Sequence, residues 1–228
     1  MSITSIVEVL EMLKAKAEPD NLEGMKDYGM AIEKRLGVSV PDMRKIAKQV
    51  GKDHLLAQGL WQTGIAEAMI VASMVDEPEK VTGQQMELWV KDIGSWDVCD
   101  QVCMNLFEKA PLAWRKVFDW SRRKEEYVKR AAYALLACLA WHDKEAPDDA
   151  FIRMLPLIKA GANDDRNYVK KAVSWALRNI GKRNAKLRAA ALQTAQELKA
   201  MGSKTAKWIA NDTIRELTNE TTRRRVEA

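Results

Sequence analysis

The chain has 228 residues, and 47% of them are apolar, which is enough to bury the core of one large domain. Glycine and proline are sparse, and Ala, Leu, Lys, Arg and Glu dominate, which favours helices over strands. The formal net charge of +5 is uneven: residues 1–95 carry 11 Lys and Arg against 15 Asp and Glu, and residues 96–228 carry 26 against 17. The basic second part indicates a polyanionic partner, although a solvated helical surface has the same composition.

Several classes of protein are disfavoured by what the sequence lacks. The odd number of cysteines, Cys99, Cys103 and Cys138, argues against a disulfide framework, and they are interpreted as small buried residues. The two histidines are far apart, so no tetrahedral metal set is expected, and no Walker, dinucleotide-binding or Ser-His-Asp pattern suggests a cofactor or a known triad. Without a leader-like N-terminus or an apolar stretch of about 18 residues, we expect a soluble, reduced, cytoplasmic protein with no membrane partner.

In chain order, the apolar spacing first predicts a helix at 3–16, with a stripe made by Ile3, Ile6, Val7, Leu10 and Leu13. A helix at 21–36 follows, then one that begins near Val40 with Pro41 in its first turn and that Gly51 closes. The remaining expected helices are 53–61, 64–76, 84–93, 96–109, 111–122, 125–141, 148–160, 166–181, 184–201 and 203–218. The charged tail 221–228 is expected to be frayed.

An internal repeat organises the second half. The Tyr-Val-Lys-Arg-Ala motif at 127–131 returns 41 residues later as Tyr-Val-Lys-Lys-Ala at 168–172, with a weaker echo at 206–210. Helix pairs at a period near 40 are typical of HEAT-type repeats, which stack to bury a common core. We therefore predict an all-α, single-domain superhelical solenoid over residues 1–228, a monomer, with helices 96–109, 125–141, 166–181 and 203–218 on its inner wall.

Candidate site residues are those that an ordinary helix would not carry. Trp96 and Asp100 are four residues apart, so they share one helix face, whereas Asp97 lies in the first turn after the plausible N-cap Ser95 and has a structural explanation. Asp100 needs a partner or a solvated cavity. A salt bridge to Arg130 is the structural alternative to a functional role.

The later helices add aromatic and basic candidates. Trp175 takes the place of Ala134 in the preceding repeat, and Arg130 corresponds to Lys171; both pairs also suit core packing or a side-chain network. The other tryptophans, including Trp141, are interpreted as packing residues. A basic wall with aromatic rings suits a nucleic acid backbone. The candidates for nucleic acid contact are Arg130, Lys171, Arg178, Lys182 and Arg183.

Three motifs, in this order, resemble the AlkD-like DNA alkylation repair proteins, a HEAT-like-repeat group of DNA glycosylases. They are Ser-Trp-Asp-Val-Cys-Asp at 95–100, Val-Lys-Arg-Ala-Ala at 128–132 and Lys-Ala-Val-Ser-Trp-Ala-Leu-Arg at 171–178, and the resemblance covers about residues 25–217. The chain departs from the family at Ser95, where the best-known members have a second tryptophan. The family also contains members with weak or no glycosylase activity that bind branched DNA.

The resemblance implies a catalytic cleft made by Trp96, Asp100 and Trp175, with Arg130 and Arg178 near DNA phosphates. It implies hydrolysis of the N-glycosidic bond of N3- or N7-alkylated purines in duplex DNA, as in base excision repair, without base flipping. The carboxylate would stabilise the positive charge that develops on the deoxyribose. Two alternatives stay open: a family member that binds damaged or branched DNA without excision, and a helical-repeat scaffold for a protein partner.

Overall fold

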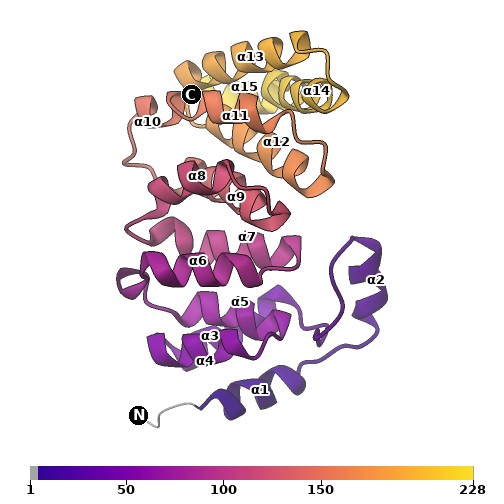
Figure 1. Ribbon diagram of the computed structural model, residues 1–228, viewed down its shortest axis with the longest axis vertical. Helices are drawn as coiled ribbons and strands as arrows, with labels where there is room; N and C mark the ends of the chain where they lie inside the picture. Colours follow the sequence, from indigo (N-terminus) through magenta and orange to yellow (C-terminus); the bar gives the residue numbers. More distant parts are fainter. Residues whose placement is uncertain (1–4, 228) are drawn as a thin grey trace. The chain divides into compact units, whose positions relative to one another are not determined.

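The computed structural model describes residues 5–227, and all the regular secondary structure in these residues is helical (Figure 1). The chain divides into two compact units, residues 1–113 and 114–228, which are described separately. Among the described residues, no helix combines the length and the apolar character needed to cross a membrane. The predicted all-α class is confirmed. The prediction of one domain stays a prediction.

The first unit is built on α5, whose residues are almost all buried. It packs against α3, α4 and α7, and α1 lies against α3 and α5 (Figure 1). Its elements are α1 (Ile6–Lys14), α2 (Asn21–Asp27), α3 (Val40–Val50), α4 (His54–Gln62), α5 (Ala66–Val75), the 3-10 helix η1 (Pro78–Lys80), α6 (Gly83–Asp92), α7 (Trp96–Asn105) and the 3-10 helix η2 (Phe107–Lys109). Ser39 caps α3 and Gly51, at φ +84°, ends it, as the sequence predicts.

The second unit is organised around two long helices, α9 and α12, which pack on one another, with α14 against α12 (Figure 1). Every residue of α9 from Arg130 to Ala140 is buried. The elements here are α8 (Ala113–Ser121), α9 (Glu126–His142), α10 (Asp148–Ile152), α11 (Leu155–Gly161), α12 (Asn167–Gly181), α13 (Ala185–Ala200), α14 (Lys204–Thr218) and α15 (Glu220–Glu227). The expected neighbours 125–141, 166–181 and 203–218 are therefore adjacent.

Contacts between α9 and α12 support the 41-residue repeat. The rings of Tyr127 and Tyr168 stack with their centroids 5.8 Å apart. Arg130 donates a hydrogen bond of 2.7 Å to the backbone oxygen of Tyr168, and Asn179 donates one of 3.1 Å to the backbone oxygen of Ala137. Each of these contacts joins residues 38 to 42 positions apart, as expected when one repeat stacks on the next.

Several predicted boundaries are wrong for physical reasons. In α1 the buried residues are Val9 and Leu13, whereas Ile6 and Val7 are exposed, and Ile3 lies outside the described residues. The helix expected at 148–160 is broken into α10 and α11, because Pro156 has no backbone N–H to continue the hydrogen-bond ladder. The tail expected to fray instead forms α15.

The largest departure is at residues 28–39, where the sequence predicts a helix to residue 36 but α2 ends at Asp27. Three residues there have positive φ: Gly29 at 75°, Lys34 at 54° and Gly37 at 80°. A Cβ at position 37 would lie 2.2 Å from the backbone oxygen of Glu18, so the close approach requires glycine. We call residues 28–39 the α2–α3 loop.

Candidate functional site

The start of α7 is fixed by an ion pair to the α2–α3 loop. The Arg35 guanidinium donates to both carboxylate oxygens of Asp97, at 2.7 and 3.0 Å. The Ser95 hydroxyl donates to Asp97 and accepts a 3.4 Å bond from the backbone N–H of Ala31. Ser95 is the N-cap residue, as predicted, but its side chain makes no capping bond to the helix. Asp97 therefore has a structural role.

Trp96 lies half-buried in the first turn of α7, and its indole N–H donates a 3.1 Å hydrogen bond to the backbone oxygen of Tyr28. Asp100, also half-buried, follows one helical turn later on the same face. The α2–α3 loop thus fixes the indole through its backbone and fixes the helix start through Arg35. The sequence gives no signal for this support, because the contacts span more than 60 residues.

The loop itself is anchored to α5 by a buried carboxylate. Glu67 has no exposed surface, and it accepts hydrogen bonds from the backbone N–H groups of Leu36, at 3.1 Å, and Gly37, at 2.9 Å. A carboxylate that leaves water must be compensated by such charge-assisted bonds. Glu67 therefore connects the first unit's central helix to the loop that positions Trp96.

In the second unit, Arg130 is only 5% exposed and makes its bond to the Tyr168 backbone across the α9–α12 contact. Lys171, its counterpart in the next repeat, is exposed, and the described contacts give its ammonium no ion pair. The repeat-equivalent cations are therefore not equivalent in environment. Lys171 can meet a phosphate at little desolvation cost.

Arg178 and Lys182 belong to an ion-pair network between α12 and α14. The guanidinium of Arg178 lies 3.3 Å from an Asp212 oxygen and also contacts Glu216, and the Lys182 ammonium lies 2.7 Å from Glu216. Ser174 donates a 2.7 Å bond to Asp212. Burial opposes ionisation of Glu216, but hydrogen bonds from Lys182 and Arg178 prevail and lower its pKa.

Arg183 is held by the protein backbone at the C-terminal end of α9. Its guanidinium donates to the carbonyl oxygens of Ala140, Asp143 and Ala146 at 3.0, 2.7 and 3.1 Å, and lies 4.2 Å from the centre of the Phe151 ring. Burial lowers the pKa of Arg183, though a guanidinium stays protonated. The bonds to Ala140 and Asp143 satisfy carbonyls at the end of α9 and give Arg183 a structural role, while contact with DNA stays a prediction.

Trp175 lies half-buried on α12, where it lines a cavity of about 820 Å³ in the second unit. Trp141, for which the sequence predicts only packing, is 53% exposed and lines the same cavity. Because Trp141 lies at the end of a wholly apolar run, the sequence does not indicate that it lines a cavity. The three cysteines are buried, as expected, and no group of three His, Cys, Asp or Glu side chains within 5–227 is arranged to hold a metal ion.

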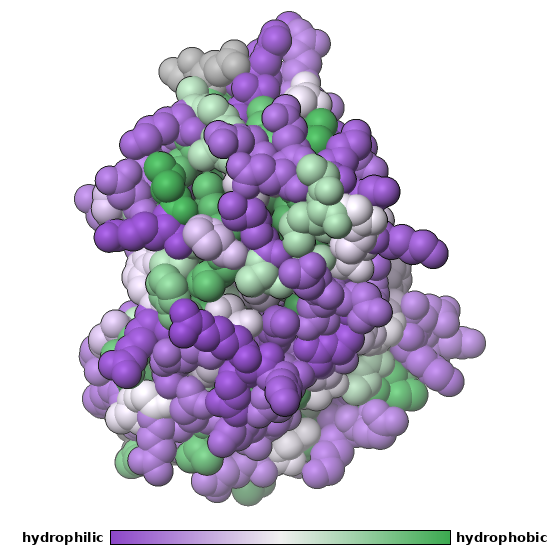
Figure 2. Space-filling view, turned by 45° about the horizontal axis from the view of Figure 1, so that its top comes forward, coloured by the Kyte–Doolittle hydropathy of each residue, from purple (hydrophilic) through white to green (hydrophobic). Residues whose placement is uncertain are grey.

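The charge is divided sharply between the units. Residues 114–228 carry 25 Lys and Arg against 14 Asp and Glu, an excess of eleven positive charges, whereas residues 1–113 carry 12 against 18. Hydrophilic residues cover most of the face shown in Figure 2, and apolar residues form small scattered patches on it. The second unit thus has the stronger electrostatic attraction for a polyanion.

The predicted site residues fall into two groups. Trp96 and Asp100 lie on α7 of the first unit, and the other candidates lie on α9 and α12 of the second or directly after α12.

The model of the DNA alkylation repair enzyme family matches residues 9–217. The chain belongs to this family. The resemblance inferred from three motifs is therefore confirmed over nearly the whole chain.

A solved structure confirms the repeat architecture. It belongs to proteins related to the HEAT-like repeat DNA glycosylases, with affinity for branched DNA structures, and superposes with a TM-score of 0.78 at 18% identity over 93% of this chain and 95% of that one. The chain thus has the HEAT-like repeat fold of its family. A designed armadillo repeat protein in complex with a (KR)4 peptide gives a TM-score of 0.40 at 15% identity, covering 96% and 86%. No curated protein matches the chain.

Proposed function

We propose that the protein is a monofunctional DNA glycosylase that hydrolyses the N-glycosidic bond of N3- or N7-alkylated purines in duplex DNA. Family membership and the presence of Trp96, Asp100 and Trp175 at the motif positions support this activity. The observation that supports it best is the half-buried carboxylate of Asp100, one turn after an indole that the Tyr28 carbonyl holds in place. The product would be an abasic site, without base flipping.

The chemistry that we assign to Asp100 is electrostatic. An alkylated purine is already cationic, so cleavage of its bond to C1′ returns the bonding electron pair to the base, which leaves neutral. The deoxyribose becomes an oxocarbenium-like cation, which a fixed carboxylate stabilises more strongly than it stabilises the neutral sugar. A water oxygen then bonds to C1′ and its proton passes to Asp100 or to solvent. The faces of Trp96 and Trp175 would attract the same positive charge.

The basic second unit would supply affinity for DNA without recognising the base sequence. Lys171, Arg178 and Lys182 are our candidates for phosphate contact, with Arg130 and Arg183 in supporting positions. Each cation that replaces a counterion makes the affinity more dependent on salt. DNA binding that weakens steeply between 50 and 200 mM salt, as expected for about six phosphate contacts, would exclude the protein-scaffold alternative.

The test is release of 7-methylguanine and 3-methyladenine from methylated duplex DNA by the wild-type protein and by Asp100→Asn. We expect the substitution to lower the rate by about 10² to 10³, the usual effect of losing one preorganised charge-stabilising group. DNA affinity and thermal stability should be retained. Asp119→Asn is a suitable control, because Asp119 is an exposed carboxylate whose pair with Arg115, at 3.6 Å, adds little stability.

The outcomes separate the alternatives. Equal release by the wild type and Asp100→Asn would show a glycosylase whose essential carboxylate lies elsewhere. Tight DNA binding without release by either protein would support a non-excising binder. The structural neighbour with affinity for branched DNA favours that second candidate, so a four-way junction belongs in the binding series.

A further inference from the structure

The cavity beside Trp175 shares Trp175, Lys182 and Arg183 with the DNA contacts proposed above, and the rest of its lining has no role in them. It lies wholly within the second unit, between the end of α9, the segment that leads to α10, the C-terminal half of α12 and α15. Its volume of about 820 Å³ is within the range of small-molecule sites, roughly 300 to 1,000 Å³. It is therefore large enough for a nucleotide.

Two indole rings line the cavity. Trp141 is 53% exposed and is held by stacking on His142, with ring centroids 4.8 Å apart and planes 20° from parallel. Trp175 contributes its half-buried ring from α12. An aromatic residue left this exposed in a polar cavity offers a flat stacking surface, and every nucleobase can stack on such a surface.

The charged groups around the rings favour an anionic ligand. Lys144, Lys182, Arg183 and Arg225 line the cavity against two acids, Glu145 and Asp148. Asp148 is already engaged, because it accepts a 2.7 Å bond from Asn184. Among the described residues no ion pair involves Arg225, and Lys144 contacts only the Trp141 carbonyl oxygen. Both cations can therefore turn to a phosphate.

We propose that this cavity is a subsite for an unpaired nucleotide of the DNA, with the base stacked on Trp141 and its phosphate at Lys144 and Arg225. The proposal rests on the DNA binding proposed above. A base inside a duplex has both faces covered by its stacked neighbours, so the occupant comes from a single-stranded flap or a branch. The alkylated base is not the expected occupant, since excision is proposed to proceed without base flipping.

The experiment compares the affinity of the wild-type protein for a blunt duplex and for the same duplex with a short single-stranded flap, by fluorescence anisotropy. We expect about tenfold tighter binding of the flap, the effect of stacking one base on an aromatic ring. Trp141→Ala should remove this preference and leave blunt-duplex affinity within twofold, and Trp141→Phe should restore it. Arg225→Gln should lower the preference, unlike Arg224→Gln, because Arg224 is paired with Glu220.

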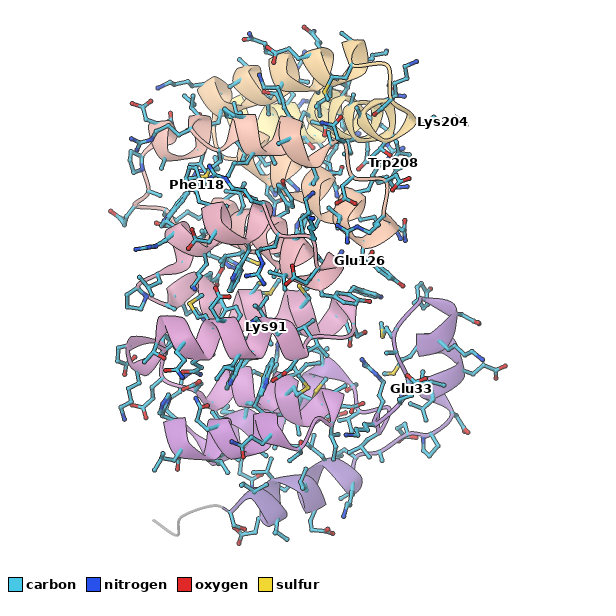
Figure 3. All side chains as sticks on the ribbon, in the orientation of Figure 1. Glu33, Lys91, Phe118, Glu126, Lys204 and Trp208 are labelled. Atoms are coloured by element: carbon cyan, nitrogen blue, oxygen red, sulfur yellow. The ribbon has the colours of Figure 1, made fainter. Side chains whose placement is uncertain are left out.

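The matched control is Trp208, which is 40% exposed on α14, one turn after Lys204 (Figure 3), and lies outside the cavity. The Lys170 ammonium covers its ring at 5.0 Å. Trp208→Ala should keep the flap preference. Equal loss in Trp141→Ala and Trp208→Ala would overturn the proposal.

Two further results would also overturn it. One is a wild type that binds both DNAs equally, which would leave the glycosylase assay unaffected and so separate this failure from failure of the proposed function. The other is saturation by free dAMP, measured by quenching of tryptophan fluorescence, at the same nucleotide concentration as by the flap. That result would assign the cavity to a free nucleotide.

Discussion

Arg183 and Lys171 provide a paired test of which cations stabilise the fold and which contact DNA. Arg183→Met would remove three hydrogen bonds from a charged donor to backbone oxygens and a contact with the Phe151 ring. Bonds to charged groups contribute about 1.5 to 3 kcal/mol each and a cation–π contact about 0.5 to 2, but much of this offsets the desolvation of a buried guanidinium. We expect a net loss of about 2 to 4 kcal/mol in the free energy of unfolding.

The assay is urea unfolding followed by circular dichroism, together with DNA affinity at two salt concentrations. The expected loss lowers the melting temperature by about 5 to 15 °C for a chain of this size. Lys171→Met should leave stability within about 0.5 kcal/mol, because the side chain is exposed, and should weaken DNA binding and its salt dependence. Unchanged stability of Arg183→Met combined with a large loss of DNA affinity would refute the structural role.

Three predictions concern other buried contacts. Glu67→Ala should lower the free energy of unfolding by about 3 kcal/mol in urea, since it leaves the N–H groups of Leu36 and Gly37 unpaired; a loss below 1 kcal/mol would refute the anchoring role. Gly161→Ala should destabilise by about 1 to 3 kcal/mol, because its Cβ would lie 2.3 Å from the buried Tyr133 hydroxyl; a neutral result would contradict this packing. The third prediction concerns the ion pairs of Asp164 and is tested with Asp164→Asn.

Arg166 and Lys129 hold the pKa of Asp164 well below its usual range, against the opposing effect of burial. A carboxyl whose pKa is lower in the folded than in the unfolded state contributes stability above the unfolded value, near 3.9, and loses it as the pH falls through the folded value. Asp164→Asn should therefore cost about 1 to 2 kcal/mol at pH 7 and progressively less below about pH 4. A constant difference across this range in urea unfolding would refute the pairing.

The sequence predicts those features of the fold that depend on local patterns. The spacing of apolar residues locates α3, α9, α12 and α14, and the 41-residue recurrence places Tyr127 against Tyr168. The pattern fails at residues 28–39. This segment is compatible with a helix but forms a loop, because Glu67, about 30 positions away, accepts hydrogen bonds from its backbone N–H groups. A local rule contains no information about such a distant acceptor.

The same distinction applies to the candidate site. Helical spacing places Trp96 and Asp100 on one face, but the sequence treats every basic residue alike. Arg183 binds backbone oxygens, whereas Lys171 is exposed, and only tertiary structure separates them. Trp141 is missed because the apolar run before it indicates burial, whereas the run ends where α9 emerges beside the cavity. That α7, α9 and α12 share one surface stays a prediction.

The α12–α14 network has a consequence for the choice of anion. Asp212 and Glu216 already occupy the positions that a phosphate would take at Arg178 and Lys182. An isolated inorganic phosphate would exchange one anionic partner for another and gain little. A DNA strand brings several phosphates linked at fixed intervals, so displacement at one cation is assisted by contacts made at its neighbours. The paired carboxylates would thus act as competitors that small anions of the cell rarely displace, while a polymer displaces them together.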